Sequence, residues 1–158
     1  RFDGKIGLIQ AEGPEGPWSN TGLAKGNTQL GPAINPGRPI VEDPFLWVSQ
    51  TAKNRGSYHM LFHDYSSVWT GAHAFSPTGE YGTWKMSNRH AHGRGVYNTT
   101  VQFTDGTAET FYRRERPELL FAEGTGEVTH LLSGLERAKT GPGPNFYQYS
   151  MSLLQPVE

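Results

Sequence analysis

The sequence predicts an all-β protein built from β-propeller blades of four antiparallel strands. Three observations lead to this fold class: 20 glycines and 11 prolines among 158 residues, an aromatic content of 12%, and a repeated pair of apolar segments. Glycine and proline mark turns, and aromatic side chains favour the pleated, half-buried surface of a sheet. Because glycine or proline interrupts nearly every window long enough for a helical period, we expect short strands joined by turns.

The repeat is the most informative feature of the chain. The segment EDPFLWVSQTAKNRGSYHMLFHDY, residues 42–65, aligns with ERPELLFAEGTGEVTHLLSG, residues 115–134. Both segments begin with Glu-x-Pro, continue through an apolar strand and a polar turn that contains glycine, and end in a second apolar strand. That second strand carries a histidine in each copy, His59 or His130. We therefore predict two copies of one β-hairpin.

The repeat extends beyond the hairpin. The segments EGPW and YGTW end at Trp18 and Trp84, each after a strand and a proline-containing turn, and we expect both side chains in the core between blades. The segment GAHAFSP supplies a third strand, and four antiparallel strands per unit are typical of a propeller blade. We divide the chain into the outer part of a blade over 1–33, one blade over 34–93, and a last blade with its closing strand over 94–158.

The first of these segments lacks a Glu-x-Pro strand before it, so the chain is predicted to begin in the middle of a blade. A propeller ring closes with at least about four blades, whereas this chain provides roughly two and a half, an incomplete ring. We therefore expect a fragment of a longer protein, with the remainder of the propeller supplied by the same protein or by another chain.

Composition excludes several classes of function. The 14 Lys and Arg residues are balanced by 15 Asp and Glu residues, and the basic residues are few and not interleaved along a groove, so we expect no nucleic-acid partner. No apolar run approaches the roughly 20 residues that span a bilayer, so we expect no membrane insertion. The chain has no cysteine, which excludes disulfides and thiolate metal sites, and we expect no cofactor.

The triplet NTT at Asn98 is a sequon for N-linked glycosylation. Such a triplet accepts a glycan in a secreted eukaryotic protein. We expect an extracellular protein, or one in the secretory pathway, and in such a protein Asn98 is the candidate glycosylation site.

These motifs resemble the five-bladed propellers of glycoside hydrolase families 43 and 32 and their relatives. The matching pieces cover most of the chain: GPW after a strand, EDPFLW followed by GSYHMLFH, HAFSPTGEYGTW, and RRERPELLF followed by THLLSG. In those enzymes the inner strands line an axial pocket with three carboxylates. An Asp in the first blade is the base or nucleophile, an Asp in an Asp-Pro motif tunes a pKa or holds the substrate, and a Glu in a Glu-x-Pro motif is the general acid. The resemblance implies Asp43 and Glu115 for the last two roles, and the first-blade Asp has no counterpart in this chain.

The resemblance implies a carbohydrate-active, glycoside hydrolase-like domain that acts on or binds a glycan in the axial pocket. Glycosidic cleavage needs a carboxylic acid that protonates the leaving oxygen and a carboxylate that acts as nucleophile or activates water. Glu115 is the candidate acid, although Arg114 and Arg116 would lower its pKa if they contact it. The alternative function is a non-catalytic extracellular module, structural or glycan-binding, which the missing first-blade Asp favours.

Charge is concentrated in one segment of a chain that is only 18% charged. The residues concerned are Arg113, Arg114, Glu115 and Arg116. In the axial funnel, the guanidinium forks would bind carboxylate or sulfate groups of an acidic or sulfated glycan. The other interpretation is structural, because the same groups could pair with carboxylates of a neighbouring blade, such as Asp43 or Glu42. A buried ion network of that kind has to be fully paired.

Three further side chains are candidates for substrate contact. His63 in LFHDY and His73 in GAHAF could approach the pocket, and for each the alternative is a satisfied structural histidine. Trp69, in the polar stretch DYSSVWTGAH, offers a flat face for sugar stacking. His90 and His92 in RHAHGRG form a His-x-His pair without a third ligand, so no metal site is predicted.

Overall fold

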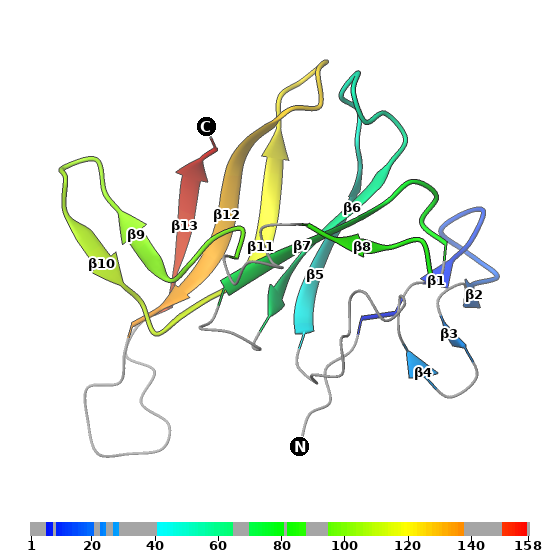
Figure 1. Ribbon diagram of the computed structural model, residues 1–158, viewed down its shortest axis with the longest axis horizontal. Helices are drawn as coiled ribbons and strands as arrows, with labels where there is room; N and C mark the ends of the chain where they lie inside the picture. The colour runs from blue at the N-terminus through cyan, green and yellow to red at the C-terminus, as the bar shows by residue number, and fades with distance from the viewer. Residues whose placement is uncertain are drawn as a thin grey trace.

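The computed structural model of the protein is all-β (Figure 1). It describes residues 6–7, 9–20, 23–24, 27–28, 41–64, 70–80, 82–87, 95–137 and 150–157, and over these residues it contains strands and no α-helix. No helix that could cross a membrane is therefore present in this part of the chain. The strands form a four-stranded sheet, a three-stranded sheet and three two-stranded pairs, and all pairings are antiparallel. The predicted all-β class is confirmed at this level.

The four-stranded sheet follows the order of the chain. Its strands are β5 (Val41–Val48), β6 (Tyr58–Asp64), β7 (Thr70–Ser76) and β8 (Lys85–Met86). A sheet in which each strand pairs with the next one in sequence is built from consecutive hairpins. In the turn between β5 and β6, Gly56 adopts a φ of 84°, a left-handed conformation that glycine accepts at little cost.

The three-stranded sheet also follows chain order and lies beside the first sheet through its first strand. Its strands are β11 (Arg113–Phe121), β12 (Val128–Glu136) and β13 (Ser150–Pro156). The two-stranded pairs are β1 (Ile9–Gln10) with β2 (Ser19–Asn20), β3 (Leu23–Ala24) with β4 (Asn27–Thr28), and β9 (Thr100–Gln102) with β10 (Ala108–Thr110). Strand β11 contacts β5 and β6, so the first strands of the two larger sheets are neighbours.

The two hairpins that were predicted to be copies share one register. The equivalent cross-strand pairs are Glu42–His63 and Glu115–Gly134 at one end, and Trp47–His59 and Leu120–His130 at the other. Each hairpin also has a register shift in its first strand, immediately after the Glu of Glu-x-Pro. The sequence repeat is therefore a structural repeat as far as Trp47 and Leu120. The registers diverge at the next residue, because Phe121 pairs with Val128 after a second shift whereas Val48 pairs with Tyr58 without one.

Three apolar clusters hold the sheets together. The first covers one face of the four-stranded sheet and consists of Ile6, Val41, Met60, Phe62, Ala72, Ala74 and Trp84. The second lies between the two larger sheets and consists of Leu61, Tyr97 and Leu131, with Trp47 and Leu119 packed against it. The third joins the β9–β10 pair to the three-stranded sheet through Val101, Phe111, Leu135 and Leu153. Because successive residues of a strand point to opposite faces, the burial of Met60, Leu61 and Phe62 shows that β6 is covered on both sides.

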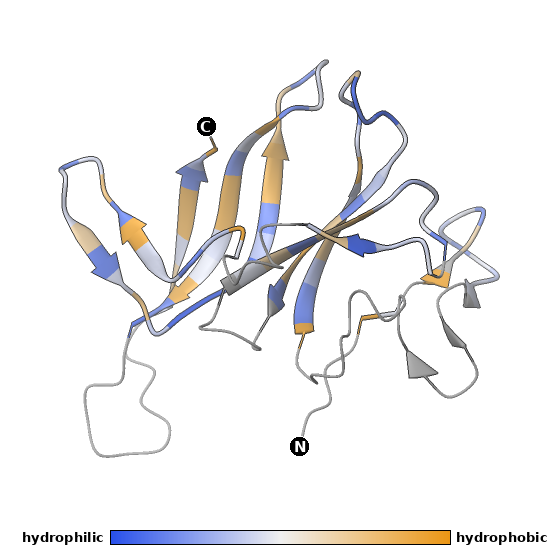
Figure 2. Ribbon diagram, in the orientation of Figure 1, coloured by the Kyte–Doolittle hydropathy of each residue, from blue (hydrophilic) through white to orange (hydrophobic). Residues whose placement is uncertain are grey.

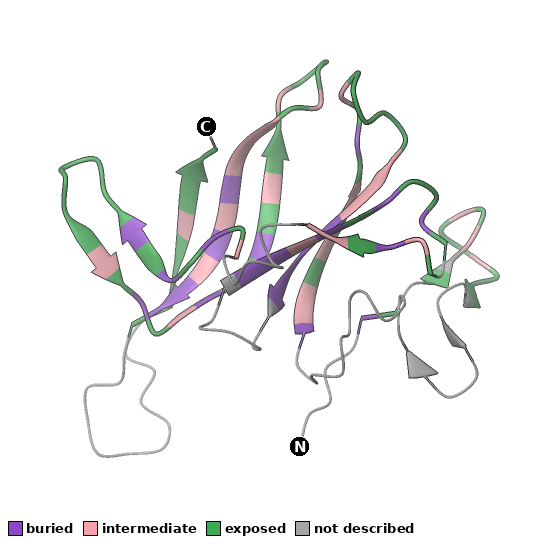
Figure 3. Ribbon diagram, viewed as in Figure 1, coloured by how far each residue is buried: buried purple, intermediate pink, exposed green. Residues whose placement is uncertain are grey.

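The distribution of polarity and burial follows from this packing. Buried residues are concentrated within β6, β7 and β12, whereas β13 is mostly exposed (Figure 3). Strand β11 is hydrophilic at its start and hydrophobic at its end (Figure 2). The polar start of β11 is the part that lies near the start of β5, so charged side chains meet where the first strands begin.

The two tryptophans that were expected in equivalent core positions differ. Trp84 is 2% exposed, and its Nε1–H donates to the carbonyl of Gly79 at 3.1 Å, so its burial is confirmed, whereas its place between blades stays a prediction. Trp18 is 57% exposed, so the expectation is wrong there. Among the described residues, β1 and β2 pair only with each other and offer Trp18 no broader sheet to pack on.

A close approach links the four-stranded sheet to the segment before β9. The amide of Gly71 donates to the carbonyl of Tyr97 at 3.1 Å, and the amide of Val96 donates to the carbonyl of Gly71 at 2.8 Å. The ring of Tyr97 lies directly over Gly71, where a β-carbon would overlap it. Only glycine permits this contact between a strand and an aromatic ring.

Replacing Gly71 with alanine is expected to destabilise the protein by about 1–3 kcal/mol, because the new methyl group displaces the buried Tyr97 ring. Chemical denaturation measures the effect. The matched control is Gly13→Ala, since a β-carbon at Gly13 meets no atom within 4 Å. Equal stability of the two variants would show that the ring does not occupy this position.

Candidate functional site

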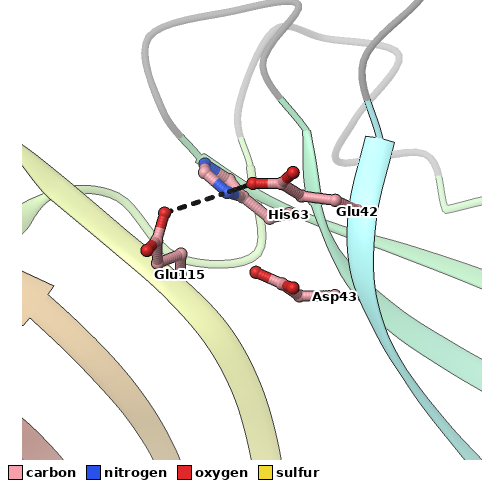
Figure 4. Close-up of side chains that lie close together, drawn as sticks. All are labelled: Glu42, Asp43, His63 and Glu115. Atoms are coloured by element: carbon pink, nitrogen blue, oxygen red, sulfur yellow. Dashed lines mark ion pairs between the residues drawn. The ribbon is translucent and has the colours of Figure 1, made fainter. Parts of the chain in front are cut away.

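Four side chains converge where β5 and β11 begin (Figure 4). They are Glu42, Asp43, His63 and Glu115, and one donor atom of each lies within 4.8 Å of the donor atoms of the others. The sequence singled out Asp43, Glu115 and His63 separately, as two catalytic candidates and one substrate contact. The fold brings these three together and adds Glu42, which was considered only as an ion-pair partner. We call this set the carboxylate–histidine cluster.

His63 is the buried centre of the carboxylate–histidine cluster. Its side chain is completely buried, and its Nδ1 lies 3.6 Å from Glu42 Oε1 and 3.9 Å from Glu115 Oε2. Burial lowers the pKa of His63, and the carboxylates of Glu42 and Asp43 oppose this effect. The imidazole is therefore neutral near pH 7 although carboxylates lie close to it.

Glu115 has the protonation behaviour of a candidate acid. Its side chain is 12% exposed, and burial raises its pKa. Arg116 and Arg113 lower the pKa, while Asp43 and Glu42 raise it further. Arg116 therefore lowers the pKa as expected on contact, but the net direction is upward, because burial is the largest effect. The arginines do contact the carboxylate, but burial outweighs them.

Arg113 and Arg116 both reach Glu115, by different routes. Arg113 shares the face of Glu115 through strand alternation, and its Nη1 lies 3.8 Å from Glu115 Oε2, while its Nε lies 3.5 Å from Glu136 Oε2. Arg116 Nη1 donates to Glu115 Oε1 at 3.0 Å, and its side chain remains 72% exposed. Substrate contact by these two residues stays a prediction, and Arg116 is the more accessible of them.

Arg114 lies inside the protein and not in the substrate-binding position that was predicted for it. It is 2% exposed, and its Nε donates to Ser133 Oγ at 3.0 Å and its Nη2 to Gln155 Oε1 at 2.7 Å. Its Nη1 donates to the carbonyl of Asn98 at 3.3 Å, and its guanidinium carbon lies 4.7 Å from the centre of the Tyr97 ring. Strand alternation turns Arg114 away from Glu115 and into the protein, where its donors are used. Its hydrogen-bond partners among the described residues are neutral groups, so the alternative of pairing with neighbouring carboxylates does not hold for Arg114 either.

His73 lies outside the carboxylate–histidine cluster, in a stack of rings on β5, β6 and β7. His73 Nε2 shares a hydrogen bond of 3.0 Å with His59 Nδ1, and His59 Nε2 shares another of 3.0 Å with Ser57 Oγ. The Trp47 ring lies 5.1 Å from the His59 ring and 5.7 Å from the His73 ring, centre to centre. This position favours the structural alternative for His73.

Burial keeps both imidazoles of the stack neutral. It lowers the pKa of His59, and burial together with the nearby His59 lowers the pKa of His73 to about 4. An imidazole–imidazole hydrogen bond needs one nitrogen with a proton and one without, and two neutral rings supply both near pH 7. Protonation of one ring leaves this hydrogen bond possible but places a charge in a buried site, so acid favours the unfolded state.

Several sequence candidates cannot be placed in the site. Trp69, His90 and His92 lie outside the described residues. Asn98 is exposed, as a glycan acceptor must be, and its Oδ1 accepts a hydrogen bond of 3.0 Å from the amide of Thr100. Its glycosylation stays a prediction.

Tyr97 is a residue that sequence reasoning missed. It is buried, and its hydroxyl has no hydrogen-bond partner among the described residues. Burial raises the pKa of Tyr97, Arg114 opposes this, and the charges of Asp43 and Glu115 raise it further. The hydroxyl therefore lies near the carboxylate–histidine cluster and stays protonated. No motif around Tyr97 indicates this position, because the ring packs on Gly71, which is distant in the sequence.

Three carboxylates and an imidazole are donor types that divalent cations accept. The carboxylate–histidine cluster could hold such an ion with its present spacing. The sequence predicted no metal site, and that prediction considered a different pair, His90 and His92.

No protein-family model, curated protein or solved structure matches the chain.

The stack of His59 and His73 predicts a loss of stability in acid. Unfolded His73 titrates near pH 6.5 and folded His73 near pH 4, so the folded state binds fewer protons in between. Neutral His73 therefore contributes fully to the free energy of unfolding above pH 6.5, and this contribution is lost as the pH falls towards 4. From pH 7 to pH 5 we expect a loss of about 1–2 kcal/mol, allowing for partial exposure.

Urea denaturation at pH 7 and pH 5 measures this loss. The variant His73→Gln should show a smaller difference between the two pH values. His130→Gln is the control, because His130 occupies the equivalent strand of the second hairpin and lies outside the stack. An unchanged pH dependence in His73→Gln contradicts the assignment.

Proposed function

We propose that the protein is a carbohydrate-active propeller domain, glycoside hydrolase-like, that acts on or binds a glycan at the carboxylate–histidine cluster. One observation carries the proposal. Asp43 and Glu115, which the resemblance implies as catalytic, belong to different sheets and nevertheless lie in one cluster. The resemblance implies that both carboxylates line one axial pocket, and their proximity supports that expectation.

The arrangement of the sheets supports the propeller. Each of the larger sheets runs in chain order, and their equivalent first strands are neighbours, as the inner strands of successive blades are. Leu120 and Leu154 are exposed on the outer face of the three-stranded sheet. Leu120 is the equivalent of Trp47, which packs with Leu119 between the two sheets. A further blade on this outer face would repeat the contact already present between the first two.

Glu115 acts as the general acid in this proposal. A general acid must hold its proton near the working pH, and burial raises the pKa of Glu115 in that direction. Asp43 helps, because its charge also disfavours ionisation of Glu115. When the acid transfers its proton to the leaving oxygen, Arg116 at 3.0 Å stabilises the carboxylate that forms.

Asp43 tunes Glu115 and holds the substrate. Donor oxygens of the two residues lie within 4.8 Å of one another, whereas the carboxyl groups of an inverting pair are about 6.5–9.5 Å apart. The space between them is too small for the attacking water of an inverting mechanism. The resemblance gives the role of base or nucleophile to an Asp of the first blade, so we place that group on another inner strand of the ring.

A non-catalytic glycan-binding module is the second candidate function. The observation that favours it is the pairing of Glu115 with Arg116 and Arg113, which stabilises the charged carboxylate and ties it to its own strand. In such a module the carboxylate–histidine cluster accepts hydrogen bonds from sugar hydroxyls and transfers no proton.

Replacing Glu115 with glutamine is expected to lower glycoside hydrolysis by about 10²- to 10⁴-fold and to leave glycan binding in place, because the amide keeps the shape but cannot donate the proton. The assay uses the natural full-length protein on 4-nitrophenyl glycosides and on neutral, carboxylated and sulfated polysaccharides. Glu118→Gln is the matched control, since Glu118 is exposed on the same strand.

The outcomes separate the two candidate functions. Binding without cleavage by the unaltered protein supports the glycan-binding module. Cleavage that survives Glu115→Gln removes Glu115 as the acid. If no glycan is bound or cleaved, the carbohydrate proposal itself is wrong.

A further inference from the structure

The two Glu-x-Pro motifs share an uncommon backbone conformation. Asp43 has a φ of 52° and Arg116 a φ of 54°, and all other described residues with a positive φ are glycines. A left-handed conformation is unfavourable for a residue with a side chain, and a following proline restricts the backbone further. Asp43 belongs to the carboxylate–histidine cluster and Arg116 contacts it. Two left-handed residues at equivalent positions of the repeat indicate a common structural role at this site.

Each left-handed residue lies in a β-bulge. Along the first strand of each hairpin, two residues stand opposite one residue of the second strand. The two residues are Asp43 and Pro44 in β5, and Arg116 and Pro117 in β11. Proline has no N–H to contribute to the ladder, so it suits the unpaired position. A left-handed first residue is the conformation in which bulges usually carry glycine.

The bulge changes which side chains can meet. In a regular strand, neighbouring residues point to opposite faces, so only one of Glu42 and Asp43 could reach His63. With the bulge, both belong to the carboxylate–histidine cluster. Glu42 also remains on the same face as Phe45, three positions later, because the residues opposite them in β6 are two positions apart.

The same change occurs in β11. Glu115 and Arg116 are neighbours, yet the guanidinium of Arg116 lies 3.0 Å from the carboxylate of Glu115. Glu115 and Glu118 share a face across the bulge, as Glu42 and Phe45 do in β5. Glu42 and Glu115 approach His63 from two different strands (Figure 4).

We propose that Asp43 and Arg116 are positioning residues whose left-handed backbones hold the two bulges that aim Glu42 and Glu115 at His63. The role belongs to the backbone conformation, and it is separate from any role of the two side chains. It rests on the geometry of the carboxylate–histidine cluster and is independent of whether a glycan is cleaved there.

The experiment compares glycine with valine at each of the two positions. Asp43→Gly and Asp43→Val both remove the carboxylate, and Arg116→Gly and Arg116→Val both remove the guanidinium. Glycine accepts a positive φ and a β-branched residue does not, so the two variants of each pair differ in their tolerance for the native backbone. Valine also adds volume, so Asp43→Ala and Arg116→Ala, which disfavour a positive φ with only a methyl group, are measured beside them.

The specific readout is the tautomer of His63, measured by ¹⁵N NMR of the imidazole. Carboxylates near Nδ1 favour the tautomer with the proton on Nδ1, and Glu42 is the nearer of the two at 3.6 Å. Glu42→Gln in the unaltered background supplies the reference signature of a lost carboxylate. The midpoint of thermal unfolding is measured in parallel.

We expect Asp43→Gly to keep the Nδ1–H signature and Asp43→Val to shift towards the signature of Glu42→Gln. Arg116→Gly should unfold at a higher temperature than Arg116→Val. If Asp43→Val does not fold, Asp43→Ala replaces it, because alanine also disfavours a positive φ but is smaller. The proposal is overturned if the glycine and valine partners show the same tautomer, or if Asp43→Gly loses the signature as completely as Asp43→Val.

Discussion

Burial of the His63 imidazole where the two larger sheets meet is the constraint on which the site depends. The side chain of His63 is fully buried, and its Nδ1 lies near Glu42 of one sheet and Glu115 of the other. A buried polar ring needs polar neighbours, and the first strands supply them as carboxylates. The same burial keeps His63 neutral and raises the pKa of Glu115, so packing sets the proton distribution of the site.

The charged residues at the start of β11 have two different functions, because the geometry of the strand points their side chains in different directions. Arg114 points inward, where its donors bind Ser133 and Gln155 and hold the three-stranded sheet together. Arg113 and Arg116 lie with the carboxylate of Glu115. Alternation accounts for the opposite directions of Arg113 and Arg114, and a bulge accounts for the contact of Arg116. One charged segment thus serves the core and the site together.

The sequence predicted the features that depend on local pattern and on the repeat. Glycine, proline and aromatic content indicated strands, and the alignment of the Glu-x-Pro segments predicted the shared register, in which Glu42 is equivalent to Glu115 and Asp43 to Arg116. It could not predict the burial of Arg114, because the partners lie on later strands. It also could not predict the bulges, since a left-handed Asp43 or Arg116 has no local signal when glycine is the usual residue.

A double-mutant cycle across the two sheets tests the central claim most directly. The free energy of unfolding is measured for the unaltered protein, His63→Gln, Glu115→Gln and the double variant. Because the two side chains lie 3.9 Å apart, the effects should be non-additive by about 0.5 kcal/mol or more. Additivity within about 0.3 kcal/mol, as for distant independent residues, would contradict the convergence of the two hairpins on one buried histidine.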